Sequence, residues 1–316
     1  MSEHRALGAT GLNIAPLVLG GNVFGIGGMD SGPSLAVLDA FVDSGGTMID
    51  TADFYAIYLP GGKGGESETM IGDWLARRGR RDDVQIATKI GGPMGPGMAG
   101  LGRDYLPKAV DTCLRRLRTD YVDLCYAHVD DPETPQEETA EAFDALVKSG
   151  KVRSIGASNF TPERLASALD IAEAKGLTRY TACQPLYNLL ERDFERELGP
   201  LCRERNIGVL TFFGLAQGYL TGKYRTEADL GKSRRGKGVQ GYMAGKGPAV
   251  LAALDLISAE RGTSLAAIAL AWLKGKPGVT APIASATSTA QLAELMPALE
   301  LELGPEEMAL LDAAGA

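Results

Sequence analysis

The chain has 316 residues, and its 32 Lys and Arg against 40 Asp and Glu give a formal net charge of −8. Hydrophobic residues make up 45% of the sequence and charged residues 23%, proportions that are typical of a folded globular protein and exclude a chain disordered throughout. The excess of acidic residues argues against nucleic acid as the main partner, because phosphate binding needs a basic surface.

The first predicted element is a hairpin over residues 4–14, where the sequence ATG favours a tight turn. We expect this hairpin to plug one end of the fold. The same segment has neither a basic leader nor an apolar core, so we expect no signal peptide. No uncharged apolar run reaches the roughly 18 residues that a membrane span needs, so we expect a cytoplasmic protein with no membrane partner.

Eight short apolar runs follow in chain order, separated by stretches whose apolar residues have helical spacing. The predicted strands cover residues 16–20, 47–50, 84–89, 121–128, 152–158, 181–185, 207–213 and 279–284. Runs that are apolar nearly throughout are typical of parallel strands buried on both faces. The alternation predicts an α/β fold, with residues 1–316 forming a single (β/α)₈ TIM-barrel domain.

An open doubly wound sheet is the alternative fold. That fold calls for a G-x-G-x-x-G turn after the first strand, and LGGNVFGIGG does not carry this spacing at the proper offset to a helix. Two long glycine-rich loops are expected, at 91–103 and 223–247, and the second also carries the basic run KSRRGK. The helical stretches at 264–275 and 305–315 are predicted as extra helices beyond the eightfold pattern.

Four ionisable side chains stand at or just after predicted strand ends: Asp50, Tyr55, Lys89 and His128. Because TIM-barrel active sites lie at the carboxyl ends of the strands, we expect these four to converge. Taken singly, Asp50 can be a helix cap, Tyr55 a half-buried loop aromatic and His128 a structural histidine. Lys89 is harder to dismiss, because a lone buried ammonium must be paired or lose its charge.

This set of residues suits proton transfer to a carbonyl oxygen. A tyrosine with an ordinary pKa near 10 is a poor acid–base group at neutral pH. A neighbouring Lys89 is expected to lower the pKa of Tyr55, while Asp50 keeps the lysine charged and in place. A neutral His128 can then orient the carbonyl.

Longer motifs around these residues extend over almost the whole chain. They are RALGATGLNIAPLVLGG, DTADFY, ATK, YAHVDD, GASNF, QPLYNLLER, GLAQGYLTGKY and PIASATSTAQLAEL. Together and in this order they resemble the aldo-keto reductase superfamily. The long 223–247 loop is similar to the branch that includes bacterial aldo/keto reductases, potassium-channel β subunits and aflatoxin-aldehyde reductases.

The resemblance implies reduction of an aldehyde or ketone by hydride transfer from NAD(P)H, with a small-molecule carbonyl as the partner. Tyr55 would donate the proton, assisted by Lys89 and Asp50, and His128 would orient the substrate. Aromatic residues and loop 91–103 would line an apolar mouth. The substrate contacts implied are Phe24, Phe54, Tyr55 and His128, with Tyr58 and Tyr126 nearby. A cofactor-sensing regulatory subunit of the channel-β type is the alternative function.

The resemblance also implies contacts to a dinucleotide. The residues expected to bind it are Gly21, Asn22, Asp50, Ser158, Asn159, Gln184, Phe212, Phe213, Gly214, Leu215, Gln217, Lys223, Arg234, Ser285, Thr287, Gln291 and Glu294. NADP(H) is the preferred prediction over NAD(H), because Lys223 and the basic run can pair with a 2′-phosphate. Thr287 leaves the choice between NADP(H) and NAD(H) ambiguous, because many members of the family have at this position an arginine that binds the 2′-phosphate.

No metal site is predicted. The sequence has two histidines, and its four cysteines include no C-x-x-C pair, so the usual spacing of a zinc cluster is missing.

Overall fold

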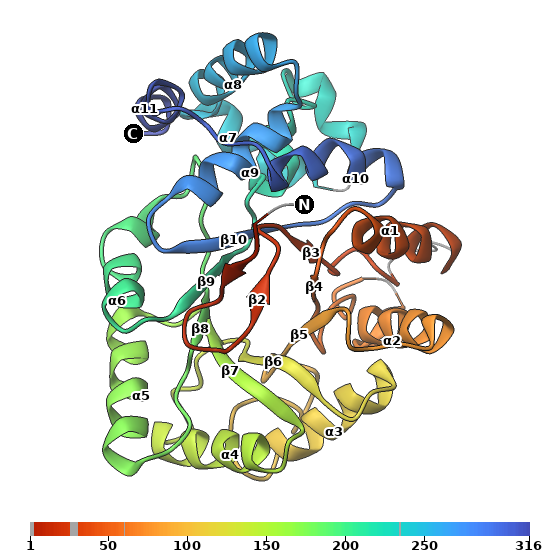
Figure 1. The fold of residues 1–316 in the computed structure, drawn as a ribbon, viewed down its shortest axis with the longest axis vertical. Helices are drawn as coiled ribbons and strands as arrows, with labels where there is room; N and C mark the ends of the chain where they lie inside the picture. The colour runs from red at the N-terminus through yellow and green to blue at the C-terminus, as the bar shows by residue number, and fades with distance from the viewer. Residues whose placement is uncertain (1–2, 26–30, 60, 234) are drawn as a thin grey trace.

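The computed structural model describes residues 3–25, 31–59, 61–233 and 235–316. Eight parallel strands close into a barrel in the order β10-β3-β4-β5-β6-β7-β8-β9, which confirms the predicted (β/α)₈ fold (Figure 1). The strands are β3 (Val18–Gly20), β4 (Met48–Asp50), β5 (Gln85–Ile90), β6 (Val122–Ala127), β7 (Val152–Ser158), β8 (Ala182–Gln184), β9 (Gly208–Thr211) and β10 (Val279–Ala284). Each lies within its predicted run or extends one residue beyond it.

The predicted N-terminal hairpin is present as β1 (Arg5–Ala6) and β2 (Asn13–Ile14), which pair antiparallel. In Figure 1 the hairpin lies across the centre of the ring of strands. Leu7 and Ile14 are fully buried and pack with the residues inside the barrel. The hairpin therefore closes one end of the barrel with apolar side chains.

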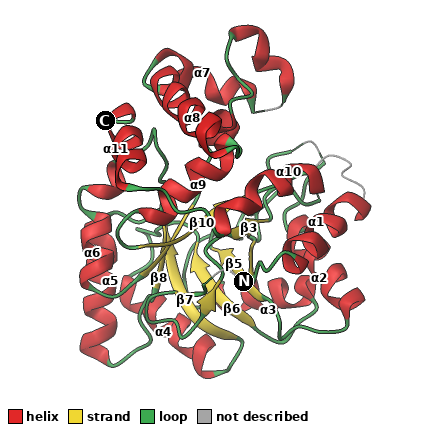
Figure 2. Ribbon diagram, turned by 45° about the horizontal axis from the view of Figure 1, so that its top comes forward, coloured by secondary structure: helices red, strands yellow, loops and turns green. Residues whose placement is uncertain are grey.

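Helices surround the barrel on its outer side, as Figures 1 and 2 show. Six of them follow strands in turn: α1 (Ser31–Asp43), α2 (Glu66–Arg78), α3 (Leu106–Leu117), α4 (Gln136–Lys148), α5 (Pro162–Lys175) and α6 (Leu198–Glu204). The remaining helices are α7 (Gly236–Ala244), α8 (Gly247–Arg261), α9 (Leu265–Gly275), α10 (Thr289–Leu295) and α11 (Pro305–Ala314). In Figure 1, α7, α8 and α11 lie to one side of the ring.

The apolar core has two layers, as the alternation of side chains in a barrel strand requires. One layer fills the barrel interior and the other packs the strands against the helices. Tyr126 belongs to the interior layer and is fully buried. A Cβ at Gly156 would lie 2.5 Å from the Tyr126 ring, so glycine is what leaves room for it. The expectation that Tyr126 lines the mouth is therefore wrong.

The two expected long loops differ from each other. No helix or strand interrupts the segment between Ile90 and Leu106. The 223–247 segment instead contains a 3₁₀ helix, Glu227–Lys232, and α7. Three glycines obscured this helix in the sequence, because glycine has low helix propensity. Packing overrides propensity here: Val239 is fully buried, and the rings of Tyr242 and Tyr219 lie 5.9 Å apart.

In the described part of the chain, no single helix is both long and apolar enough to cross a membrane. Helices α8 and α9 meet that test only as a pair, and they are bent by 102° relative to each other.

Candidate active site

The carboxyl ends of β4, β5 and β6 bring the four predicted catalytic residues together. Asp50 is the last residue of β4, Lys89 lies one residue before the end of β5, and His128 directly follows β6. Tyr55 lies on the loop after β4 and returns toward the strands, since its hydroxyl contacts Lys89. Parallel pairing of β4 with β5 and of β5 with β6 fixes their relative heights.

Lys89 is the centre of this group. Its Nζ donates to Asp50 Oδ2 at 2.5 Å, to the Thr51 carbonyl at 2.9 Å and to the Tyr55 hydroxyl at 2.9 Å. Lys89 and Asp50 are each 1% exposed. An ammonium has three protons, and all three are used. The sequence expectation of a paired, buried lysine is thus met by the geometry.

The pKa of Lys89 is raised, although burial by itself lowers it, because Asp50 and Tyr55 favour the charged form. Lys89 is therefore an ammonium at neutral pH. Its charge is balanced by the Asp50 carboxylate at salt-bridge distance.

The pKa of Tyr55 departs from the sequence expectation. Burial raises it to about 12, and the opposing effect of Lys89 is smaller. Burial removes water from the phenol, which disfavours the phenolate. The Lys89 ammonium compensates only in part, because the Asp50 carboxylate beside it offsets its positive charge. Tyr55 is therefore a protonated donor across the neutral range rather than a readily ionised group.

His128 faces this group from β6. Its backbone N–H donates to the Ile90 carbonyl at 2.9 Å, and its ring centroid lies 6.2 Å from that of Tyr55 and 4.5 Å from that of Phe54. Burial and the charge of Lys89 lower the pKa of His128 well below its usual value, so the ring is neutral. Its Nδ1 is buried without a hydrogen-bond partner among the described residues.

The residues predicted to contact a nicotinamide form one hydrogen-bond network with Asp50 and the His128 backbone. Gln184 Nε2 donates to Asp50 Oδ1 at 2.8 Å, and Ser158 Oγ donates to the Gln184 carbonyl at 2.9 Å. Asn159 Nδ2 donates to Ser158 Oγ at 3.2 Å and to the His128 carbonyl at 2.8 Å. Both amide protons of Asn159 are donated within the protein, so the atom of this side chain that can bind a ligand is its acceptor, Oδ1. One network thus runs from the strand ends of β7 and β8 to Asp50.

The aromatic pair Phe212 and Phe213 follows β9. The two ring centroids lie 5.3 Å apart in an edge-on arrangement. The Phe212 N–H donates to the Pro185 carbonyl at 3.0 Å, which places Phe212 next to the end of β8 and so next to Gln184. Phe212 is half-buried and Phe213 is 40% exposed, so aromatic surface remains available beside the amide of Gln184.

Unusual backbone geometry gathers around this site. Five non-glycine residues with left-handed φ lie on loops after barrel strands: Ala56, Asn159, Phe213, Ala216 and Gln217. Such conformations each cost about 1–3 kcal/mol and are often found at functional sites. Asn188 supports one of them, since its Nδ2 donates to the Phe213 carbonyl at 3.0 Å.

A further group of predicted cofactor residues lies after the ends of β3 and β10. Ser285 Oγ donates to Asn22 Oδ1 at 2.7 Å, which joins the two ends. Gln291 Oε1 accepts from both the backbone N–H and the hydroxyl of Thr287 at 2.9 Å. Glu294 is exposed. These contacts place four predicted residues at one edge of the barrel.

Some predicted cofactor residues have close packing contacts. A Cβ at Gly21 would lie 2.8 Å from Ser67 Oγ, and one at Gly214 would lie 2.9 Å from a Leu273 methyl. Both glycines therefore serve the fold directly, whatever else they bind. Arg234 lies outside the described residues.

Two further predicted cofactor residues, Lys223 and Gln217, contact different neighbours. Lys223 is exposed, and a Cβ at Gly218 would lie 3.1 Å from its Nζ. Gln217 extends toward α7, where a Cβ at Gly238 would meet Gln217 Oε1 at 2.5 Å. Leu215 is partly buried against the outer core layer.

The predicted substrate residues separate into exposed and buried ones. Phe24 is completely buried and packs in the outer core layer, where it supports the loop after β3. Its contact with substrate stays a prediction. Phe54 packs edge-on against Tyr58 with centroids 6.3 Å apart. Four of the exposed large apolar residues in the described chain follow β4, β5, β8 and β9: Tyr58, Met98, Leu186 and Phe213.

Sequence reasoning missed Thr51 and Asn188, which hold Lys89 and Phe213. Thr51 acts through its carbonyl, which no side-chain pattern reveals. Asn188 lies in the QPLYNLLER motif but had no assigned role. Within the described residues, no group of three or more His, Cys, Asp or Glu side chains could hold a metal ion.

Comparison with known proteins finds a family model and relatives that match this chain along nearly its whole length. A model described as the aldo/keto reductase family matches residues 16–316. "Uncharacterized oxidoreductase YrpG" of Bacillus subtilis is 34% identical, over 98% of this chain and 95% of the relative. "Norsolorinic acid reductase stcV" of Emericella nidulans is 32% identical, over 98% and 80%. A Saccharomyces cerevisiae protein provisionally named an aryl-alcohol dehydrogenase is 31% identical, over 99% and 86%.

Proposed function

Because this chain belongs to the aldo/keto reductase family of oxidoreductases, we propose that it reduces an aldehyde or ketone to the alcohol with Tyr55 as the proton donor. The observation that carries this proposal is the saturated Lys89 ammonium. It is buried and donates to Asp50, Thr51 and the Tyr55 hydroxyl together. Besides its ion pair with Asp50, the ammonium donates a proton to the Tyr55 hydroxyl and so orients that phenol.

Tyr55 supplies the proton to the carbonyl oxygen as that oxygen gains negative charge. With its pKa raised to about 12, the phenol carries its proton throughout the neutral range. As the proton leaves, the phenolate forms 2.9 Å from the Lys89 ammonium, which stabilises it. Asp50 keeps that ammonium oriented and charged. Neutral His128 orients the carbonyl from the other side.

The cofactor we propose is a nicotinamide dinucleotide, which supplies the hydride when bound. Asn159 Oδ1 has no protons to donate and suits a carboxamide N–H, while Ser158 and Gln184 hold that amide in place. The half-buried Phe212 ring offers a stacking surface beside them. This donor and acceptor set fits a nicotinamide ring at the ends of β7 and β8.

NADP(H) is the preferred cofactor in this proposal. The exposed ammonium of Lys223 lies beside Gly218 and has no carboxylate ion-pair partner among the described residues. A phosphate can therefore take that position with a charge-assisted bond. NAD(H) is the alternative, because Thr287 beside Gln291 is uncharged.

An aromatic or otherwise apolar carbonyl compound is the proposed substrate class. Tyr58, Met98, Leu186 and Phe213 leave a rim of exposed apolar surface around the mouth, and such surface is typical of a binding site. The name of the yeast relative, an aryl-alcohol dehydrogenase, supports the same class.

The test is to follow oxidation of NADPH and NADH by absorbance across a panel of aryl and alkyl aldehydes and ketones. We expect turnover with aryl aldehydes that is abolished or greatly reduced in Tyr55→Phe. Tight cofactor binding without turnover of any carbonyl would contradict the reductase proposal and support the cofactor-sensing alternative.

A further inference from the structure

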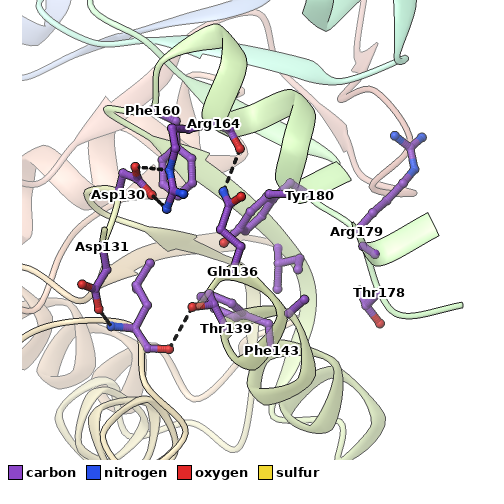
Figure 3. Close-up of a pocket in the computed structure, with 15 residues that line it drawn as sticks. Asp130, Asp131, Gln136, Thr139, Phe143, Phe160, Arg164, Thr178, Arg179 and Tyr180 are labelled. Carbon is purple, nitrogen blue, oxygen red and sulfur yellow. Dashed lines mark hydrogen bonds and ion pairs between the residues drawn. The ribbon is translucent and has the colours of Figure 1, made fainter. Parts of the chain in front are cut away.

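Two consecutive carboxylates follow His128 and point to different neighbours. Figure 3 shows Asp130 directed at Arg164, with Asp131 turned away from that pair. Asp131 instead accepts a hydrogen bond from the Leu101 backbone N–H. The reductase proposal uses His128 and leaves both carboxylates without a task.

These carboxylates do not form a second ligand site. The cavity that they border, between α4 and α5, measures about 20 Å³. A space of that size holds about one water molecule. The two side chains must therefore act through the groups that they contact.

Asp131 holds the base of the 91–103 loop. Its Oδ2 accepts from the Leu101 N–H at 2.7 Å and from the Thr134 hydroxyl at 2.7 Å. Thr139 Oγ1 donates to the Leu101 carbonyl at 3.3 Å, so both backbone groups of Leu101 are engaged. A Cβ at Gly100 would lie 2.7 Å from Asp131 Oδ2, so a side chain there would crowd this contact.

The loop held in this way forms one wall of the mouth. A Cβ at Gly92 would lie 3.3 Å from the Phe54 ring, which in turn packs on His128. Met94 reaches the loop after β4, since a Cβ at Gly64 would lie 2.5 Å from its methyl. Met98 is 48% exposed near the tip of the loop. The position of Leu101 thus sets the position of apolar surface beside Phe54.

Asp130 holds a different element. Its two oxygens accept from Arg164 Nε at 2.6 Å and Nη2 at 2.9 Å, a bidentate pair. Arg164 lies in the first turn of α5, and its carbonyl accepts from Gln136 Nε2 at 2.8 Å. Asn159 lies just before α5 and donates to the His128 carbonyl. Asp130 therefore fixes the start of α5, and with it Asn159, against the segment that carries His128.

We propose that Asp130 and Asp131 are positioning residues with separate tasks, and this inference rests on the proposed reductase function. Asp131 sets the substrate wall through Leu101 and the 91–103 loop, and so determines the fit of bulky carbonyl compounds. Asp130 sets the cofactor side through Arg164 and Asn159. One dipeptide after the catalytic histidine thereby aligns both halves of the site with it.

The kinetic test compares Asp131→Asn and Asp130→Asn with 2-naphthaldehyde and propanal as substrates and NADPH as cofactor. Asp131→Asn should raise KM for 2-naphthaldehyde about tenfold, the effect of one hydrogen bond to a charged group. KM for propanal, kcat and the Kd of NADPH should stay near wild type. Asp130→Asn should instead raise the Kd of NADPH. It should also lower kcat, and the factor by which kcat falls should be the same for the two aldehydes.

Asp111→Asn is the matched control, because it removes an exposed carboxylate that pairs with Lys151. An exposed pair contributes little, so this variant should match wild type in every constant. Equal changes in KM for both aldehydes in Asp131→Asn, or constants equal to those of Asp111→Asn, would overturn the proposal. Thr139→Val, which removes the other bond to Leu101, should shift the same KM in the same direction.

Amide hydrogen exchange by mass spectrometry gives a readout that does not depend on turnover. Asp131→Asn should speed exchange in peptides covering 91–103 and leave those covering 158–165 unchanged, and Asp130→Asn should do the reverse. Identical exchange in both variants would overturn the separate tasks. If the wild type reduces no carbonyl while this exchange pattern holds, the reductase proposal fails and the loop-holding roles stand.

Discussion

The two sides of the barrel mouth are built in different ways. On the β4–β5 side, Asp50 and Lys89 sit on strands and are held by buried hydrogen bonds between charged groups. After β9, four residues of the 213–218 segment have left-handed φ, and the segment is held by the Asn188 hydrogen bond to the Phe213 carbonyl and by contact with α7. The first side should therefore respond to loss of charge, and the second to changes in backbone and contact shape.

The largest expected effect breaks the charged side. Lys89→Met leaves Asp50 buried with its charge uncompensated, so we expect a loss of about 3–5 kcal/mol in the free energy of unfolding. Its kcat should fall at least as far as in Tyr55→Phe, because the forming phenolate loses its cation. Urea unfolding and steady-state kinetics measure both. The double variant Lys89→Met, Asp50→Asn should recover stability without recovering activity; equal stability of the single and double variants would contradict this account.

Tyr55→Phe tests proton donation on that same side. We expect kcat to fall by about 10²-fold or more, as loss of a general acid does, with the Kd of NADPH unchanged. The Phe ring preserves packing but leaves one proton of the buried Lys89 ammonium without its acceptor, so we expect a loss of about 1–3 kcal/mol in the free energy of unfolding. A kcat within a few-fold of wild type, with chemistry rate-limiting, would remove Tyr55 from the mechanism.

Lys223→Ala tests whether the charge of Lys223 contributes to cofactor binding. If Lys223 pairs with a 2′-phosphate, the Kd of NADPH should rise about tenfold to a hundredfold while the Kd of NADH stays the same. The effect should shrink as salt rises, because the side chain is exposed. Fluorescence titration of both cofactors measures it. Equal losses for NADH and NADPH would assign Lys223 to the shared part of the dinucleotide.

Gly236→Ala tests whether the position of α7 matters for cofactor binding. A Cβ there would lie 1.7 Å from the Leu230 carbonyl oxygen, so α7 must move and carry Gln217 with it. We expect the Kd of both cofactors to rise together. Gly241→Ala is the control, since a Cβ there meets nothing within 4 Å. It should leave Kd unchanged and stabilise α7 by about 1 kcal/mol.

The pH profile is where the smallest effect is expected. Since the pKa of His128 lies well below its ordinary 6.5, the neutral ring persists as pH falls through that value. Since the pKa of Tyr55 is raised from 10.0 to about 12, its proton is kept as pH rises through 10. The kcat/KM of reduction should therefore be flat across this interval. A step near 6.5 would show that His128 titrates normally in the free enzyme.

Parts of the fold and site were predictable because the sequence records them locally. The apolar strand runs gave the barrel, and polar residues at their ends gave Asp50, Lys89 and His128. Helix α7 was not predicted, because Gly236, Gly238 and Gly241 obscure a helix that tertiary packing stabilises. Tyr126 was expected at the mouth but lies in the barrel interior, because an aromatic residue near a strand end can face either layer.

By itself the sequence determined which side chains stand together at the carboxyl ends of the strands. Side chains alternate between the two faces of a strand, and parallel strands bring their carboxyl ends to the same end of the barrel. Only the tertiary structure decided how their charges behave. Lys89 lowers the pKa of Tyr55 as expected, but burial of the phenol raises that pKa by more, and the Asp50 carboxylate raises it further. Desolvation and the sharing of a counter-charge depend on every neighbour in three dimensions, and no local motif encodes them.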